Sequence, residues 1–208
     1  MIDQTTLITY LAILLGFVFL PGPAVLMTLA RASSSGTRIG VVTALGIAVG
    51  DFVHTVMAVV GMSAVILASA FLFSLIKYLG AAYLVYLGLR AIFENAEYGE
   101  TCTSKRLTPK VAFQQAVLAE ILNPKSALFF LAFLPQFVEP ENGSVSGQLM
   151  VLGILFILMG LLSTLLVAMS AGSMGTFLRR YPVVLRQQGK VVGGIYCGLG
   201  LRLALQEK

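Results

Sequence analysis

Charged residues are scarce in this chain of 208 amino acids: they make up 11% of it, whereas hydrophobic residues make up 58%. The mean hydropathy is +0.92. A soluble domain cannot bury so large an apolar fraction in a single core, so the composition excludes a soluble fold and predicts an integral membrane protein in a lipid bilayer. The net charge of +5 would suggest nucleic acid as a partner of a soluble protein. In a membrane protein most basic residues orient the chain instead, and we expect no nucleic-acid partner.

Cysteine and histidine are scarce as well. The two cysteines, Cys102 and Cys197, lie far apart and outside any C-x-x-C motif, and His54 is the single histidine. The sequence therefore indicates neither a disulfide framework nor a metal cluster, and we expect no metal site and no cofactor. A G-x-x-x-x-G-K-[ST] loop is also absent, which argues against ATP-driven transport.

Long apolar runs are what the chain has in abundance. Residues 5–30 can cross the ~30 Å hydrocarbon layer with only the proline break in them, and several further stretches are as long. The first run follows Asp3 without a basic residue and has no small-residue cleavage pattern after it, so we expect it to be retained. The predicted fold is an all-α integral membrane protein with six transmembrane helices over residues 5–30, 39–67, 70–93, 111–137, 147–174 and 190–205.

Lysine and arginine are distributed unevenly among the connecting loops. Ten of them follow the first, third and fifth spans, whereas the loop after the fourth span, "EPENGSVSG", has none. Since cytoplasmic loops are enriched in lysine and arginine, both termini are predicted to lie outside the cytoplasm. The loop 94–110 is then a cytoplasmic connector.

The two halves of the chain share a pattern of residues, which indicates an internal duplication. Glycines spaced by four and then six residues follow the first span and the fourth, and a Lys-Gly-Tyr series recurs in the third and sixth. The matching sets are Gly36, Gly40 and Gly46 with Gly143, Gly147 and Gly153, and Lys77, Gly80 and Tyr83 with Lys190, Gly193 and Tyr196. We interpret residues 5–93 and 111–205 as two three-helix repeats of a single transporter domain spanning 1–208. Because each repeat has an odd number of spans, the second is inverted relative to the first.

Prolines interrupt the first and fourth helices at corresponding positions, in "LPGPA" and "ILNPKS". A proline donates no hydrogen bond to the carbonyl four residues earlier, so the carbonyls of Phe17, Phe19 and Glu120 lose their helical donors. In lipid such groups are tolerated only beside protein, water or a ligand. The half-helices that follow begin with free N–H groups and a positive dipole end, which favours an anion. The alternative is that the prolines are packing kinks.

The two breaks therefore supply the candidate substrate-binding residues. Asn123 is expected to cap the second half-helix, and Lys125 could meet a substrate carboxylate or only neutralise Glu120. The predicted substrate-binding set is Pro21, Gly22, Pro23, Ala24, Asn123, Pro124 and Lys125.

Ionisable groups within the spans carry the remaining functional candidates, because each costs at least ~2.5 kcal/mol to insert at mid-bilayer. Asp51 could carry a proton or pair with a substrate ammonium, or could tie helices together as a neutral or paired carboxyl. His54, three residues on, lies on the same helix face and could titrate or only join two helices by a hydrogen bond. Glu120 could be a second coupling carboxyl or the counter-ion of Lys125. We take Asp51, His54 and Glu120 as the proton-coupling candidates.

Several longer motifs resemble a known family. The segments "LPGPAVLMTLARA", "KYLGAAYLVYLGLRAIF" and above all "NPKSALFFLAFLPQF" resemble the LysE/RhtB family of bacterial amino-acid exporters over almost the whole chain. The resemblance implies six helices, no ATP use, a place in the bacterial inner membrane, and efflux of amino acids or close derivatives coupled to protons.

The leading hypothesis is thus a secondary active exporter whose partners are an amino acid, protons and the lipid bilayer. A neutral or weakly polar cargo is favoured, since few acidic residues remain in the spans to pair a second positive charge. Two alternatives are a divalent-metal exporter, for which the chain offers few ligands, and a membrane thiol-redox protein, which needs paired cysteines. Two G-x-x-x-G motifs, at Gly46 and Gly194, permit close helix approach, either within the chain or in a homodimer.

Overall fold

The computed structural model describes residues 2–19, 22–93, 107–180 and 182–205, and all of the regular structure in these ranges is helical. The first half contains α1 (Gln4–Phe19), α2 (Pro23–Ser35), α3 (Thr37–Met57), the π-helical turn η1 (Ala58–Met62), α4 (Ser63–Ala68) and α5 (Ala70–Phe93). The second half contains α6 (Pro109–Ile121), α7 (Pro124–Leu128), the π-helical turn η2 (Phe129–Phe133), the 3₁₀ turns η3 (Leu134–Phe137) and η4 (Pro140–Asn142), α8 (Val145–Arg180) and α9 (Pro182–Leu205).

Membrane-capable helices dominate both halves. Three helical segments of the described residues are long and apolar enough to cross a bilayer: Thr37–Ile66, Phe71–Phe93 and Val145–Ala171. Two bent pairs, α1 with α2 and α6 with α7 to Phe137, bring the number to five if each pair forms one span. The apolar part of α9, Gly193–Leu205, is shorter than a full span. The chain is therefore an all-helical membrane protein, as its composition predicts.

Proline chemistry explains both bends. α1 ends at Phe19 and α2 begins at Pro23, with their axes 45° apart. α6 ends at Ile121 and the next helical segment begins at Pro124, bent by 42°. In each case the proline occupies the first turn of the new helix, where its missing N–H is not needed.

α3 is the central helix of the larger helical group and packs against α2, α6 and α8. Glycine allows the closest of these contacts. A Cβ on Gly46 would lie 2.7 Å from the backbone oxygen of Phe113, and one on Gly50 would lie 2.5 Å from the Cβ of Glu120. This G-x-x-x-G motif thus serves packing within the chain. A Cβ added to Gly194 or Gly198 of α9 would meet no described atom within 4 Å.

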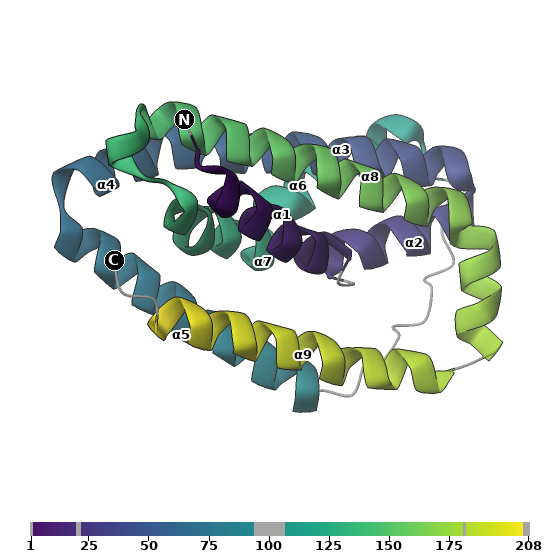
Figure 1. Cartoon of the computed structure of the whole chain (residues 1–208). Coiled ribbons are helices and arrows are strands. Elements are labelled where there is room, and N and C mark those ends of the chain that lie inside the picture. The colour runs from purple at the N-terminus through teal and green to yellow at the C-terminus, as the bar shows by residue number, and fades with distance from the viewer. Residues whose placement is uncertain (1, 20–21, 94–106, 181, 206–208) are drawn as a thin grey trace.

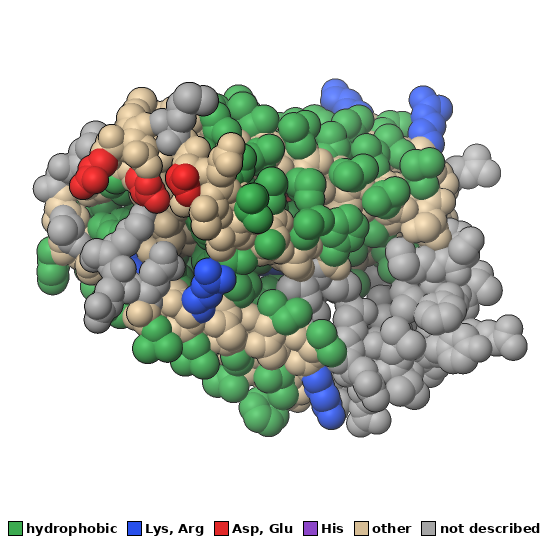
Figure 2. All heavy atoms as spheres, viewed as in Figure 1, with side chains coloured by type: hydrophobic (Ala, Val, Ile, Leu, Met, Phe, Trp, Pro, Cys, Tyr) green, Lys and Arg blue, Asp and Glu red, His purple; other side chains and the backbone are tan. Residues whose placement is uncertain are grey.

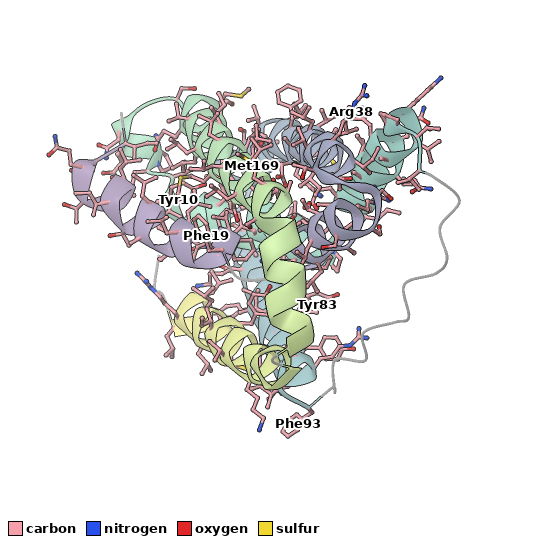
Figure 3. All side chains as sticks on the ribbon, turned by 90° about the vertical axis from the view of Figure 1, so that its right-hand side faces the viewer. Tyr10, Phe19, Arg38, Tyr83, Phe93 and Met169 are labelled. Carbon is pink, nitrogen blue, oxygen red and sulfur yellow. The ribbon has the colours of Figure 1, made fainter. Side chains whose placement is uncertain are left out.

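α5 and α9 form a second, antiparallel pair, which lies below the larger group in Figures 1 and 3. Their contact is the most extensive between any two described elements. A Cβ on Gly88 would meet Cys197 and the backbone of Gly193, and a Cβ on Gly200 would meet the backbone of Ala81 and Val85. The pair is therefore held at a distance that only glycine permits.

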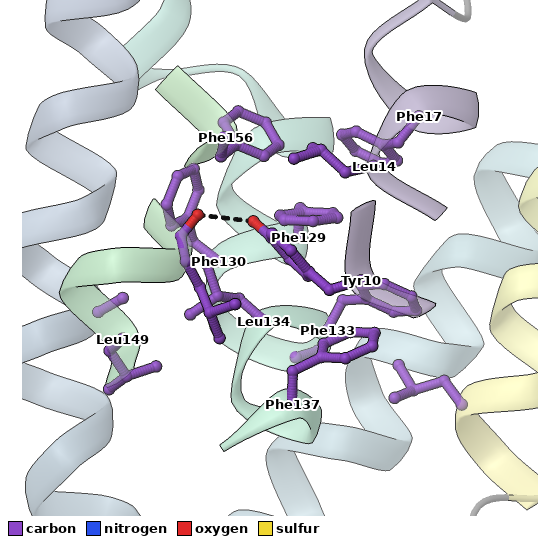
Figure 4. Close-up of a cluster of buried hydrophobic side chains, with 14 of the residues drawn as sticks. Tyr10, Leu14, Phe17, Phe129, Phe130, Phe133, Leu134, Phe137, Leu149 and Phe156 are labelled. Carbon is purple, nitrogen blue, oxygen red and sulfur yellow. Dashed lines mark hydrogen bonds between the residues drawn. The ribbon is translucent and has the colours of Figure 1, made fainter. Parts of the chain in front are cut away.

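A cluster of aromatic side chains fills the space between α1, η2, η3 and α8 (Figure 4). The ring centroids of Phe17 and Phe129 lie 4.5 Å apart, and those of Phe129 and Phe156 lie 4.7 Å apart. Tyr10, fully buried, donates its hydroxyl to the carbonyl oxygen of Leu152 at 2.7 Å. That hydrogen bond satisfies the one polar atom that the Tyr10 side chain brings into the cluster.

Hydrophobic and charged side chains lie on different parts of the surface. Figure 2 shows hydrophobic side chains over the middle of the molecule and acidic side chains at the end that holds the N-terminus. The acidic residues of the described chain that are not buried are Asp3, Glu139 and Glu141. Figure 2 also shows Lys or Arg side chains at the opposite end of the larger helical group, and others on the lower side of the molecule.

Candidate functional site

A small cavity of about 40 Å³ lies where the two helix breaks meet. Both breaks and the helices that flank them contribute to its wall, together with α3 and α8, and the lining combines apolar and polar side chains. The lining residues are Phe17, Val18, Gly22, Ala24, Val25, Ile47, Asp51, Glu120, Asn123, Lys125, Ser126, Phe156, Gly160 and Thr164. A water needs roughly 10–15 Å³ of such volume, so the cavity has room for a few waters.

Lys125 is buried and reaches from α7 to the end of α1. Its Nζ donates to the carbonyl oxygen of Phe17 at 3.0 Å. This is a carbonyl that loses its helical donor because residue 21 is proline. The ammonium also lies 4.3 Å from the ring centroid of Phe17 and 5.7 Å from that of Tyr196, close enough for cation–π attraction.

Asn123 organises the start of α7. Its Oδ1 accepts from the backbone N–H of Lys125 at 3.0 Å, so Asn123 is the N-cap that the sequence predicts. The same contact corrects one expectation, since the N–H of Lys125 is occupied and not free for a substrate. The amide nitrogen of Asn123 donates to Glu120 Oε1 at 3.0 Å and to Ser126 Oγ at 3.3 Å. Ser126 Oγ also donates to Glu120 Oε1.

Asp51 and Glu120, both 2% exposed, bring two carboxyl groups to the cavity. Asp51 interacts electrostatically with Glu120 and with Lys125. Its Oδ1 has no hydrogen-bond partner among the described residues, although it is buried. A buried carboxyl oxygen without a partner is costly in a membrane interior, and a proton, a water or a cation at Asp51 would lower that cost.

His54 lies one turn beyond Asp51 but does not line the cavity. Its Nε2 is 3.0 Å from the carbonyl oxygen of Glu120, and because a carbonyl can only accept, this nitrogen donates. The imidazole also stacks on Phe130 at 5.6 Å. His54 therefore satisfies the carbonyl that Pro124 deprives of its helical donor, and it joins α3 to α6.

The N-terminus of α2 lies at the cavity. Gly22, Ala24 and Val25 line it, and no side chain caps this 13-residue helix. The first N–H groups of a helix have no partner within it, so this end favours an anion. Pro23 and Pro124 are exposed and do not line the cavity. Their part is to break the helices. Pro21, also predicted for the site, lies outside the described residues.

Several residues at the site escaped the sequence analysis. Gly160 and Thr164 present one face of α8 to the cavity, and a Cβ on Gly160 would lie 3.5 Å from Asp51 Oδ2. Ser163, next to Thr164, donates to the carbonyl of Val18 at 3.0 Å. A small residue followed by a hydroxyl four positions later, within an otherwise apolar span, was the signal available in the sequence.

The site suits an amino acid better than a metal ion. The described residues contain no group of three or more His, Cys, Asp or Glu side chains placed to hold a metal. Cys197 faces the carbonyl of Val85 at 3.8 Å, away from the cavity, and Cys102 lies outside the described residues. A lysine, two carboxyls and an open helix N-terminus beside apolar walls are instead the groups that a zwitterion with an apolar side chain requires.

Comparison with known proteins decides the family. The model of the LysE type translocator family matches residues 15–207. The chain belongs to this family. Members of the family are transporters, so the chain is a membrane transporter and not an enzyme, which removes the thiol-redox alternative.

Relatives of this LysE-family chain occur in several bacteria. A membrane protein of Vibrio cholerae is 32% identical over 197 residues, covering 95% of both chains. The membrane protein YrhP of Bacillus subtilis is 34% identical, covering 76% of this chain and 79% of its own. A protein of Salmonella typhimurium named leucine efflux protein is 28% identical, covering 94% of this chain and 93% of its own. No solved structure gives a significant match.

Proposed function

We propose that this LysE-family transporter exports leucine and similar neutral amino acids from the cytoplasm in exchange for protons, by alternating access. The observation that carries the proposal is that Lys125, Asp51, Glu120 and the N-terminus of α2 meet around one cavity between apolar walls. The leucine efflux protein among the relatives supports the same cargo.

The carboxylate and the ammonium of the amino acid would bind opposite groups of the site. The N–H groups of Ala24 and Val25, with the ammonium of Lys125, favour the carboxylate. Asp51 and Glu120 favour the ammonium. The side chain would lie against apolar lining residues, which are Phe17, Val18, Val25, Ile47 and Phe156.

Charge balance explains how protons would be coupled. With all groups ionised, the two carboxylates and Lys125 leave one negative charge in a buried site. A single proton neutralises this charge. A bound zwitterion adds no net charge, but its ammonium can pair with the carboxyl that the proton would occupy while its carboxylate lies at α2 and Lys125. Proton and substrate ammonium therefore compete for the same carboxyl pair, and such competition produces exchange.

Contacts between the helices support six spans arranged as two inverted repeats. If α1–α2, α3 and α5 correspond to α6–α7, α8 and α9, exchanging the repeats turns the contact of α2 with α8 into that of α7 with α3. It also turns the contact of α1 with α8 into that of α6 with α3, and all four contacts occur. The contacts of Gly88 with Gly193 and Cys197 match those of Gly200 with Ala81 and Val85. Inverted repeats of this kind enclose a midplane site and rock around it.

Opening of the site requires movement, because a cavity for a few waters cannot hold leucine. The aromatic cluster seals the side toward α1 and η3, and the hydrogen bond from Tyr10 to Leu152 joins α1 to α8 there. We propose that this side faces away from the cytoplasm, as the lysine and arginine distribution favours, in a bacterial inner membrane with both termini outside.

Transport in reconstituted vesicles tests the proposal. Purified protein would be placed in vesicles loaded with each of the twenty labelled amino acids in turn, with and without an inwardly directed proton gradient, and with protein-free vesicles as the control. We expect leucine and other neutral amino acids to leave several-fold faster with the gradient. No release of any amino acid, with or without the gradient, would refute amino-acid export, and gradient-independent release would refute proton coupling.

A further inference from the structure

The ammonium of Lys125 occupies a cage that is suited to any primary amine. The cage includes the carbonyl oxygen of Phe17 at 3.0 Å and the faces of two rings, Phe17 at 4.3 Å and Tyr196 at 5.7 Å, and Asp51 and Glu120 attract the ammonium electrostatically. Aromatic faces and a carbonyl lacking its helical donor attract a cation without contributing charge of their own. The side chain of Lys125 therefore occupies a subsite that could bind another ammonium group.

Gly22 is the residue that leaves room for this arrangement. A Cβ at Gly22 would lie 3.0 Å from Cδ and 3.1 Å from Nζ of Lys125. The backbone there is extended, with φ −112°, so that glycine is not required by the conformation. The absence of a side chain at Gly22 therefore leaves room for the side chain of Lys125 to cross the helix break.

We propose that Lys125 is a tethered competitor for the ammonium group of the substrate. On binding, its Nζ leaves the Phe17 carbonyl and pairs with the substrate carboxylate, and the substrate ammonium takes the vacated cage beside Asp51. This proposal rests on the amino-acid export proposed above. It adds a prediction about selectivity. Only a ligand with both an ammonium and a carboxylate can fill the vacated cage and also pair with the displaced ammonium of Lys125.

Three compounds that share the side chain of leucine test this prediction about selectivity. L-Leucine carries both groups, leucinol carries the amine alone, and 4-methylpentanoate carries the carboxylate alone. Leucinol would have to expel Lys125 without offering it a carboxylate. The purified protein should therefore bind leucine more tightly than either partial analogue, as measured by ligand-dependent rise of the unfolding temperature in detergent.

Two variants test the competition. Lys125→Met empties the cage, so the ratio of the leucinol Kd to the leucine Kd should fall by at least about tenfold. Loss of a positive charge would by itself favour an amine, and Gly22→Ala controls for this because it disturbs the lysine and keeps its charge. In Gly22→Ala the ratio should still fall, by about threefold or more.

Lys77→Met is the matched control, since Lys77 is also buried, lies 4.7 Å from the Tyr78 ring and does not line the cavity. Its ratio should equal that of the unaltered protein. An unchanged ratio in Gly22→Ala, with or without a fall in Lys125→Met, would overturn the competition while leaving amino-acid export intact. Failure of the unaltered protein to bind leucine or any other amino acid would overturn both proposals together.

Discussion

Two of the buried charged residues at the site have specific neighbours that hold them. The ammonium of Lys125 is held by a carbonyl and two rings, and Glu120 accepts hydrogen bonds from Asn123 and Ser126. Asp51 differs, because its Oδ1 has no partner in the described chain. Asp51 therefore keeps a carboxyl oxygen without a partner, and for this reason we propose it as the place of the exchangeable proton.

Replacing Asp51 by Asn should separate coupling from binding. Asparagine keeps the shape of the side chain and cannot take up or release a proton, so acceleration of efflux by a proton gradient should disappear. Exchange of internal for external labelled leucine at equal pH should continue at a measurable rate. Asp3→Asn, which alters an exposed carboxyl and preserves an oxygen acceptor for the N–H of Thr5, is the control. Retention of full gradient-driven efflux in Asp51→Asn would contradict the coupling role.

Two substitutions at Asn123 separate its role as the N-cap of α7 from its contact with Glu120. Asn123→Ala removes the N-cap of α7 and two donors, and should lower the free energy of unfolding by about 1 kcal/mol, with a lower midpoint in thermal unfolding. Asn123→Asp keeps an acceptor for the N–H of Lys125 but sets a carboxylate against Glu120. We expect Asn123→Asp to slow leucine efflux more than Asn123→Ala does. Equal unfolding midpoints for Asn123→Ala and the unaltered protein would show that the cap contributes nothing.

Among the helices, the two proline breaks and the glycine contacts have separate tasks. The breaks release carbonyls that Lys125 and His54 then satisfy. The glycines fix how closely α3 approaches α6, and so the distance between the helix that carries Asp51 and the helix that carries Glu120.

Gly50→Ala should disturb this approach, because the new Cβ would lie 2.5 Å from the Cβ of Glu120 and 3.3 Å from the backbone nitrogen of Ile121. Overpacking of this kind costs about 1–3 kcal/mol, and displacement of Glu120 should reduce leucine efflux. Gly16→Ala is the matched control, since no atom lies within 4 Å of the added carbon on α1. It should leave efflux unchanged and leave thermal stability equal or slightly higher. Equal efflux from the two variants would show that α3 and α6 can separate without consequence.

Across the whole molecule, the distribution of lysine and arginine among the loops predicts how it sits in the membrane. A cysteine introduced at Glu141 should react with a membrane-impermeant maleimide added to intact cells, because the end with the acidic side chains is expected outside. A cysteine at Arg38 should react only after the membrane is permeabilised. Both would be placed in a chain in which Cys102 and Cys197 are replaced by Ser and Ala. The reverse labelling pattern would invert the proposed topology.

Much of the architecture follows from local chemistry that the sequence already displays. Apolar runs predict helices in lipid, since a backbone there must satisfy its own hydrogen bonds. The prolines of the two breaks predict where α1 and α6 end, because a proline cannot donate to the preceding turn. Asn123 as an N-cap and the proximity of Glu120 to Lys125 follow from residues close together in the chain. The boundary of α4 and α5 at Ser69 is expected from the length of the apolar stretch alone.

Contacts between distant segments required the fold. The sequence does not show that Lys125 reaches Phe17 across 108 positions, that His54 binds the Glu120 carbonyl, or that α8 lines the cavity with Gly160 and Thr164. Residue pattern determines which groups are unsatisfied within a helix, because hydrogen bonds there join neighbours four residues apart. Which distant side chain satisfies them depends on how the helices pack, and packing is a property of all the helices together.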